Sequence, residues 1–104
     1  VLWCESDRGA ILGSDSIGEI GKPSEMVGIE VARKLVSEIE SRATVDVHMA
    51  DMLIPYVALS KGMSTFKVRE ISDHLETNIW LCEKILGASF SIKMVDGIFK
   101  VTKM

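Results

Sequence analysis

Both histidines of this 104-residue chain stand where a helix is expected to begin. His74 lies in the segment SDHLETN (residues 72–78), and His48 opens the segment HMADM (residues 48–52). A helix N-terminus presents unpaired backbone N–H groups and a partial positive charge, which attract phosphate and keep a nearby imidazole neutral and therefore nucleophilic. This placement indicates chemistry on a phosphate group.

Plainer interpretations of the same residues stay open. A histidine at a helix N-terminus is more often a capping or solvated residue than a nucleophile. His48 and Asp51, three residues apart, could contact a ligand or metal together, or could form a local polar patch. A metal site of His48, Asp51, His74 and Cys82 would need distant segments to converge, and the apolar stripe around Cys82 makes it a core residue first.

Composition limits the classes of protein that fit. With 47% hydrophobic residues, the chain should form one compact domain with a modest core. A net charge of −3 argues against an autonomous nucleic-acid-binding module, because affinity for phosphate backbones comes from clustered Lys and Arg. Two cysteines without CxxC spacing predict neither a zinc knuckle nor a disulfide framework, so a reducing, cytoplasmic setting fits best.

Targeting and membrane signals are not apparent in the sequence. No apolar run approaches the roughly 20 residues that a membrane span needs, and no charged-then-apolar signal segment opens the chain, so we expect no membrane partner. The chain begins at Val1, inside an expected strand and without an initiator methionine. We therefore expect it to be part of a longer protein.

Hydrophobic periodicity predicts the element order ββααβαββ. We expect strands at residues 1–5, 10–14, 64–71, 90–94 and 98–102, and helices at 23–41, 47–60 and 73–86. In the third strand, Phe66 and Val68 should lie on the side opposite Lys67 and Arg69. The simplest arrangement is an α+β, two-layer fold with a roughly four-stranded mixed or antiparallel sheet and the helices on one face.

The first two helices carry specific local signals. Pro23 suits the first turn of the first helix, and Glu30 with Lys34 should form an i,i+4 pair on its exposed side. Asp46 is a suitable N-cap for the second helix. Within that helix, Pro55 cannot donate a hydrogen bond to the carbonyl of Asp51, which is left free.

The third helix is the most strongly patterned. Asp73 and Glu76 form a start similar to a capping box, and Gly87 is suited to end the helix. The predicted core stripe consists of Leu75, Ile79, Cys82 and Leu86. We expect the ring of His74 to be accessible in the first turn, and His48 and Asp51 to share a face that opens toward it.

Longer segments of the sequence resemble the RNA 3'-terminal phosphate cyclases. The segments VLWCE (1–5), LGSDSIGEIGKPSEMVG (12–28), HMADMLIPYVAL (48–59) and HLETNI (74–79) are similar to the last third of that family, in the same order and at fitting separations. The resemblance implies an enzyme that uses ATP, with a divalent cation such as Mg²⁺ or Mn²⁺, to convert an RNA 3'-phosphate into a 2',3'-cyclic phosphate. It also implies a covalent histidine–AMP intermediate.

The resemblance assigns roles to individual residues. His74 falls on the adenylylated histidine, within an H-x-x-T-N-like element. The nucleotide-pocket segment, usually an aromatic residue or His followed by L-A-D-Q, falls on five consecutive residues: His48, Met49, Ala50, Asp51 and Met52. Met52 stands where glutamine is usual, so an amide that can both donate and accept hydrogen bonds is missing there.

The resemblance also implies an architecture and partners. Residues 1–104 would be a single C-terminal module, the last repeat of a cyclase body whose repeats are similar to the C-terminal domain of translation initiation factor three. The family supplies arginines, metal-site and adenine-stacking residues from its N-terminal portion, so this piece alone should be inactive. Its partners would be RNA 3'-phosphate ends and the upstream part of the same protein, and surface exposed by truncation could let the piece self-associate.

Two other functions are compatible with the sequence. One is a non-catalytic cyclase-like ribosome-assembly factor, although such relatives lack the nucleophilic histidine and His74 is present here. The other is an RNA-binding or protein-interaction module without chemistry. The acidic net charge weighs against the RNA-binding version.

Overall fold

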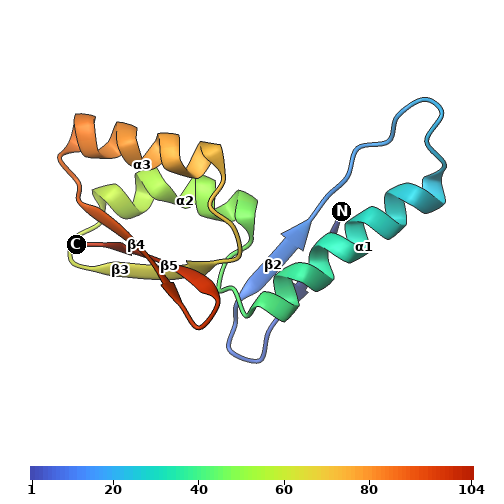
Figure 1. The fold of residues 1–104 in the computed structure, drawn as a ribbon, viewed down its shortest axis with the longest axis horizontal. Helices are drawn as coiled ribbons and strands as arrows, with labels where there is room; N and C mark the ends of the chain where they lie inside the picture. The colour runs from blue at the N-terminus through green and yellow to red at the C-terminus, as the bar shows by residue number, and fades with distance from the viewer.

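The computed structural model describes residues 1–104 as three helices and two small antiparallel sheets (Figure 1). In chain order, the elements are β1 (Leu2–Glu5), β2 (Ile11–Ser14), α1 (Ser24–Ser41), α2 (Val47–Leu59), β3 (Ser64–Val68), α3 (Asp73–Leu86), β4 (Phe90–Val95) and β5 (Ile98–Lys103). The predicted α+β class and the order ββααβαββ are confirmed. None of the helices is both long and apolar enough to cross a membrane.

The strands divide between two sheets instead of joining in one. β1 pairs only with β2, whereas the second sheet has the order β3-β5-β4. The linker between α1 and α2 explains the separation, because it occupies the free edge of β3: Thr44 N donates to the carbonyl of Lys67 at 3.0 Å, and Lys67 N donates to Thr44 Oγ1 at 2.8 Å. These bonds use backbone groups to which another strand would have to pair.

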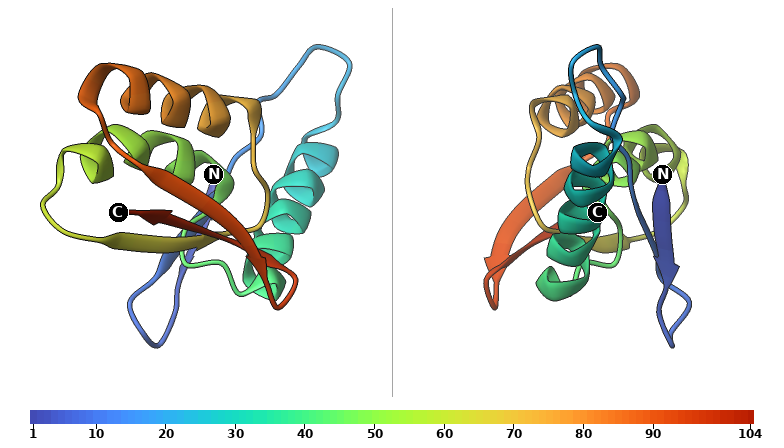
Figure 2. Two further views of the ribbon diagram at one scale, coloured as in Figure 1. Left: turned by 60° about the vertical axis from the view of Figure 1, so that its left-hand side comes forward. Right: turned by 90° about the vertical axis from the view of Figure 1, so that its right-hand side faces the viewer.

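The chain therefore folds as two layered units. α2 and α3 lie on one face of the three-stranded sheet, whereas α1 packs against the β1–β2 hairpin to one side (Figures 1 and 2). The helices are thus not all on one face of a common sheet. This arrangement creates a seam where the hairpin unit meets the N-terminus of α2 and the end of β3.

The main core lies between the helix pair and the three-stranded sheet. Its buried members come from α2, β3, α3 and β5: Ala50, Ile54, Phe66, Val68, Leu75, Ile79, Cys82 and Val101. The predicted inward sides of β3 and α3 are therefore confirmed, with one exception. Leu86, the last residue of α3, is 45% exposed, so the buried stripe ends one turn earlier at Cys82.

Near the start of α1 the observed ion pair differs from the predicted one. Glu30 Oε2 accepts hydrogen bonds from Lys22 Nζ at 2.8 Å and Ser16 Oγ at 2.9 Å, whereas Lys34 Nζ donates to the backbone carbonyl of Asp15. The predicted Glu30–Lys34 pair was wrong because the loop before α1 folds back along the helix and supplies nearer partners. These two hydrogen bonds lower the pKa of Glu30, and the one from Lys22 has the larger effect.

Candidate functional site

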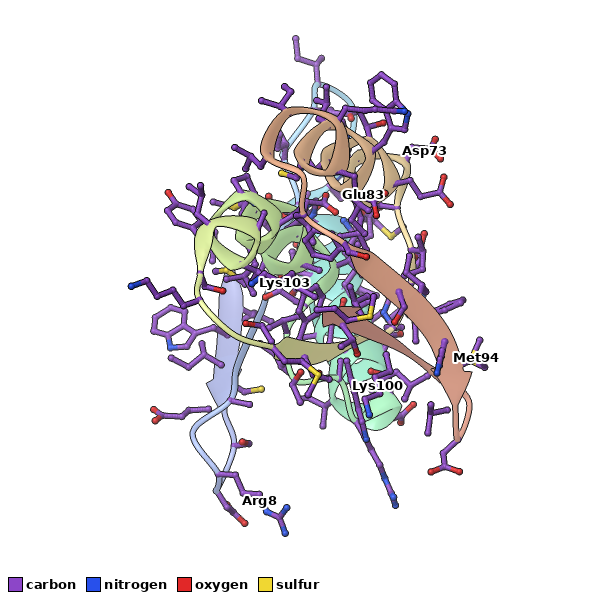
Figure 3. The ribbon with its side chains drawn as sticks, turned by 90° about the vertical axis from the view of Figure 1, so that its left-hand side faces the viewer. Arg8, Asp73, Glu83, Met94, Lys100 and Lys103 are labelled. Atoms are coloured by element: carbon purple, nitrogen blue, oxygen red, sulfur yellow. The ribbon has the colours of Figure 1, made fainter.

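His74 occupies the first turn of α3 with an exposed side chain, as predicted. The helix runs from Asp73 to Leu86 and ends at Gly87, whose φ of 68° is in the left-handed region. Its N-cap is Ser72, whose Oγ accepts from Leu75 N at 3.0 Å, so the predicted cap at Asp73 was displaced by one residue. The Asp73 side chain instead projects away from the body of the protein (Figure 3).

One residue of α2 holds this first turn of α3 in place. Asp51 Oδ1 accepts from Ser72 Oγ at 2.6 Å, and the Asp51 carbonyl accepts from Asn78 Nδ2 at 2.9 Å. The carbonyl is available because Pro55, four residues later, has no N–H to donate to it. The sequence predicted the free carbonyl, and the structure identifies its partner. His74 lies between the two residues that are tied to α2.

His48 has the equivalent position in α2 but faces another part of the molecule. Asp46 caps this helix as predicted, with Oδ1 accepting from Met49 N at 2.8 Å, and its Oδ2 accepts from Gly13 N of β2 at 2.9 Å. The His48 side chain is 76% exposed, and its Nε2 lies 3.8 Å from Asp15 Oδ1. An exposed pair at this distance contributes little stability, so the ring is free to contact a ligand.

The side chains of His48 and Asp51 therefore have partners in different units. Residues three apart on a helix point about 60° away from each other, which here is enough to direct one toward the hairpin and the other toward α3. Only Asp51 reaches the α3 N-terminus that carries His74. The predicted shared opening toward His74 is not supported by these contacts, because His48 lines a cleft of about 260 Å³ with Gly13, Ser14 and Asp46.

The rest of the predicted nucleotide segment is unequally accessible. Ala50 is completely buried in the core, so its side chain cannot contact a ligand. Met49 and Met52 are exposed, and Asp51 is half-buried. The segment therefore offers His48, Met49 and Met52 as exposed side chains, while Asp51 connects the two helices.

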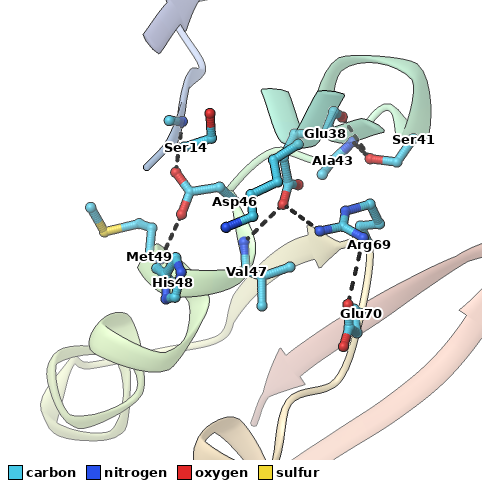
Figure 4. Close-up of polar contacts among 12 residues, drawn as sticks. Ser14, Glu38, Ser41, Ala43, Asp46, Val47, His48, Met49, Arg69 and Glu70 are labelled. Carbon is cyan, nitrogen blue, oxygen red and sulfur yellow. Dashed lines mark hydrogen bonds and ion pairs between the residues drawn. The ribbon is translucent and has the colours of Figure 1, made fainter. Parts of the chain in front are cut away.

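An ion pair with a buried carboxylate, at the seam between the two units, was not predicted. The Glu38 side chain is only 4% exposed, and its Oε1 accepts from Arg69 Nη2 at 3.2 Å and from Val47 N at 3.3 Å (Figure 4). Arg69 also lies 3.5 Å from the Glu70 carboxylate. The sequence did contain a signal, because Glu38 falls on the same helical face as Val31 and Leu35. A carboxylate within an apolar stripe needs a buried partner.

No three or more His, Cys, Asp or Glu side chains converge to hold a metal ion. Of the residues considered for such a site, Cys82 packs in the core, and burial raises the pKa of its thiol. Asp51 binds α3, and His48 is paired loosely with Asp15.

Comparison with known proteins establishes the family. The family model for RNA 3'-terminal phosphate cyclase matches residues 12–92. The chain belongs to this family. Cyclases from three archaea are among its relatives: the protein from Pyrobaculum aerophilum is 47% identical over 101 residues, that from Methanopyrus kandleri 42% over 97, and that from Korarchaeum cryptofilum 44% over 93.

The matches cover nearly all of this chain but a minor part of each relative. They include 97%, 93% and 89% of the chain, respectively, but only 29%, 28% and 26% of the three cyclases. The chain therefore spans less than a third of the length of these relatives.

Proposed function

We propose that this chain is the C-terminal module of an RNA 3'-terminal phosphate cyclase that uses ATP to convert RNA 3'-phosphate ends into 2',3'-cyclic phosphates. The family match over residues 12–92 supports this function. The observation that carries the chemical assignment is the position of His74, an exposed imidazole in the first turn of a helix that is fixed on both sides of it by Asp51.

In the proposed first step, a neutral imidazole nitrogen of His74 attacks the α-phosphorus of ATP. A nitrogen–phosphorus bond forms, and the bond to pyrophosphate breaks. Closing a cyclic phosphate requires a leaving group on the RNA 3'-phosphate. An oxygen of that phosphate attacks the phosphorus of the AMP carried by His74, the nitrogen–phosphorus bond breaks to free the imidazole, and AMP becomes joined to the RNA 3'-phosphate through a phosphoanhydride. The 2'-hydroxyl can then attack the activated phosphorus, lose its proton and release AMP.

The α3 N-terminus suits the nucleophile better than it suits the triphosphate. The backbone N–H groups of Asp73 and His74 precede the first hydrogen bonds of the helix and point toward any group bound at its end. Two acidic side chains, Asp73 and Glu76, share that turn. They would repel phosphates, so the opposing charge has to come from basic groups elsewhere in the full-length protein.

The residues of this chain do not by themselves form a site for a divalent cation such as Mg²⁺ or Mn²⁺. We therefore assign the ligands of such a cation to the rest of the full-length enzyme. His48, Met49 and Met52 would contribute one wall of the nucleotide pocket, where the histidine ring can stack on a base and the two methionines can pack against it.

The proposed partner for the exposed face of α2 is the upstream part of the same protein. Met52, Tyr56 and Leu59 follow one another along this face and are all exposed, which is unusual for large apolar side chains in one patch. Without that partner, the same patch could drive self-association of the 104-residue chain.

The test is covalent labelling of the full-length protein with α-labelled ATP and a divalent cation. Label should be retained in an acid-labile, alkali-stable linkage, as expected for a phosphoramidate, and His74→Ala should abolish it. His48→Ala is the matched control, because His48 is also exposed in the first turn of a helix; it should weaken ATP use and leave some labelling.

Two results would contradict the assignment. Normal labelling of His74→Ala would show that another group is the nucleophile. Wild-type protein that takes up no label with either cation, yet still binds RNA, would favour the non-catalytic assembly factor or interaction module.

A further inference from the structure

The open face of the three-stranded sheet carries a row of lysines. In the sheet register, Lys67 of β3 and Lys93 of β4 are both paired with Lys100 of the central strand β5. Residues directly opposite one another in antiparallel strands project from the same face. The neighbouring positions Phe66 and Val101 face the helices and are buried, so the three lysines project from the other face. Figure 3 shows Lys100 on the side of the strands away from α2 and α3, and Lys103 on the side toward the helices.

This row is not explained by folding. None of the three lysines forms an ion pair, and like charges placed directly opposite one another destabilise a sheet. The adjacent row on one side contains only hydroxyl side chains, Thr65, Thr102 and Ser91, with Thr65 Oγ1 and Thr102 Oγ1 3.3 Å apart; the row on the other side includes the apolar pair Val95 and Ile98. A face that combines unpaired ammonium groups with hydroxyl donors is complementary to phosphate oxygens.

The lysine row leads into a cavity beside the hairpin. Its volume is about 580 Å³, within the range of ligand pockets, and Lys67 contributes to its lining. Two further cations, Arg8 and Arg42, line the same cavity, against a single carboxylate, Glu5. The apolar part of the lining includes Leu12 and Ile39, so the cavity can accept a flat, largely apolar group beside its cations.

We propose that this basic face, consisting of Lys93, Lys100 and Lys67 together with Arg42 and Arg8 at the cavity, binds the backbone of a single RNA strand. Neighbouring strands of a sheet are about 4.8 Å apart, so the row spans about 10 Å and can contact successive phosphates. A single strand fits better than a duplex because only an unpaired base can enter the cavity. The face itself carries no aromatic side chain on which bases could stack, so binding along it is independent of sequence.

The choice of RNA as the polyanion rests on the proposed function. The surface is separate from His74, because α3 lies on the opposite face of the sheet. It would hold RNA at a distance from the reacting 3' end. Loss of the lysines should therefore weaken RNA binding without removing the group that becomes adenylylated.

The test measures equilibrium binding of a fluorescent single-stranded RNA of about 12 nucleotides by anisotropy, without ATP. The RNA ends in a 3'-hydroxyl, so binding cannot depend on the proposed reaction. The variants are Lys67→Gln, Lys93→Gln and Lys100→Gln, singly and together. The control is Lys84→Gln, which removes an exposed, unpaired lysine from α3 on the other side of the molecule.

The salt dependence distinguishes direct phosphate contacts from an indirect effect. For single strands, each contact adds about −0.7 to the slope of log K against log salt concentration, so the three lysines should contribute about −2. Raising the salt from about 50 to about 200 mM should then weaken the binding due to this row about 20-fold. Each single variant should flatten the slope by about 0.7 and the triple variant by about 2. Lys84→Gln should leave it unchanged.

Folding is checked in the same variants by circular dichroism and urea unfolding. Because the substitutions remove like-charge repulsion, the triple variant should be at least as stable as the wild type. A folded triple variant with the wild-type slope would overturn the proposal, as would equal losses in Lys84→Gln. Binding to anionic lipid vesicles but not to RNA would replace RNA with a membrane surface. His74→Ala should bind this RNA normally, so failure of the labelling test would not affect this result.

Discussion

The hydrogen bond from Asn78 to the carbonyl of Asp51 can be tested together with Pro55, which leaves that carbonyl without a donor in its own helix. Asn78→Ala removes the only donor to a carbonyl that Pro55 has left without its helical partner. An unsatisfied buried acceptor costs about 1–3 kcal/mol, and this contact is only partly buried, so we expect a loss of about 1 kcal/mol. For a domain of this size, that corresponds to a decrease in Tm of about 4 °C.

Pro55→Ala provides the second arm of the experiment. An alanine at position 55 restores a backbone N–H that can donate to the Asp51 carbonyl from within the helix. In that background, Asn78→Ala should cost little, because its target already has a donor. The two substitutions should therefore show a coupling free energy of about 1 kcal/mol in a double-mutant cycle.

The measurement is urea unfolding followed by far-UV circular dichroism for the wild type, the two single variants and the double variant. Thr77→Ala is the control, because Thr77 is the exposed neighbour of Asn78 in the same helix. An equal loss of unfolding free energy for Asn78→Ala in the wild-type and Pro55→Ala backgrounds would refute the reasoning. They would mean that Asn78 stabilises α3 by packing and not by satisfying the orphaned carbonyl.

Three further outcomes are expected from other sites. Cys4 should react with a thiol-specific disulfide reagent well before Cys82, because burial raises the pKa of the Cys82 thiol and shields it; equal rates in a spectrophotometric assay would contradict this. Lys22→Ala should raise the pKa of Glu30 in an NMR titration. Because folding lowers that pKa, the wild type should be more stable than the variant at neutral pH, and this difference in unfolding free energy should vanish as the pH falls through the folded-state pKa. Glu38→Gln should lower the free energy of unfolding by about 1–3 kcal/mol, because the buried Glu38 carboxylate accepts a charged, partly buried hydrogen bond from Arg69 across the two units; unchanged urea unfolding would show that the ion pair is not what joins them.

Local structure was predictable because its causes are local. The bounds of α3, from Asp73 to Leu86, follow from the apolar stripe and from Gly87, which takes a φ of 68° just after the helix. The tight turn between β4 and β5 is another example. Asp96 and Gly97 both have positive φ, 52° and 81°, which is the conformation that a two-residue hairpin turn prefers.

The division into two sheets could not be predicted from the strand patterns. Alternation identifies a strand and its buried side, but it does not identify which edge remains free for pairing. Here two linker residues, Thr44 and Val45, bond to Lys67 at the edge of β3. The Glu38–Arg69 pair has the same origin, since the two residues are far apart in sequence and meet only at the seam.

For the candidate site, residue types and helix positions were predictable, whereas their partners were not. Helical spacing placed His48 and Asp51 near each other on α2 but could not show that His48 lies beside Asp15 of the hairpin unit. It also could not show that the Asp51 carboxylate accepts a hydrogen bond from Ser72. The role of Asp51 in positioning α3 follows from its contacts with that helix.

Net charge averages over surfaces of opposite sign. The net charge of −3 combines two surfaces. At the α3 N-terminus, the acidic residues Asp73 and Glu76 flank His74. On the open face of the sheet, three lysines have no acidic partner: Lys67, Lys93 and Lys100. Groups at the first surface can supply a nucleophile but cannot neutralise a triphosphate. Groups at the second can neutralise phosphates but lie on the other side of the sheet from His74. In the proposed function, the chain's own lysines would therefore bind the RNA backbone, whereas adenylylation of His74 would need cations supplied from outside the chain.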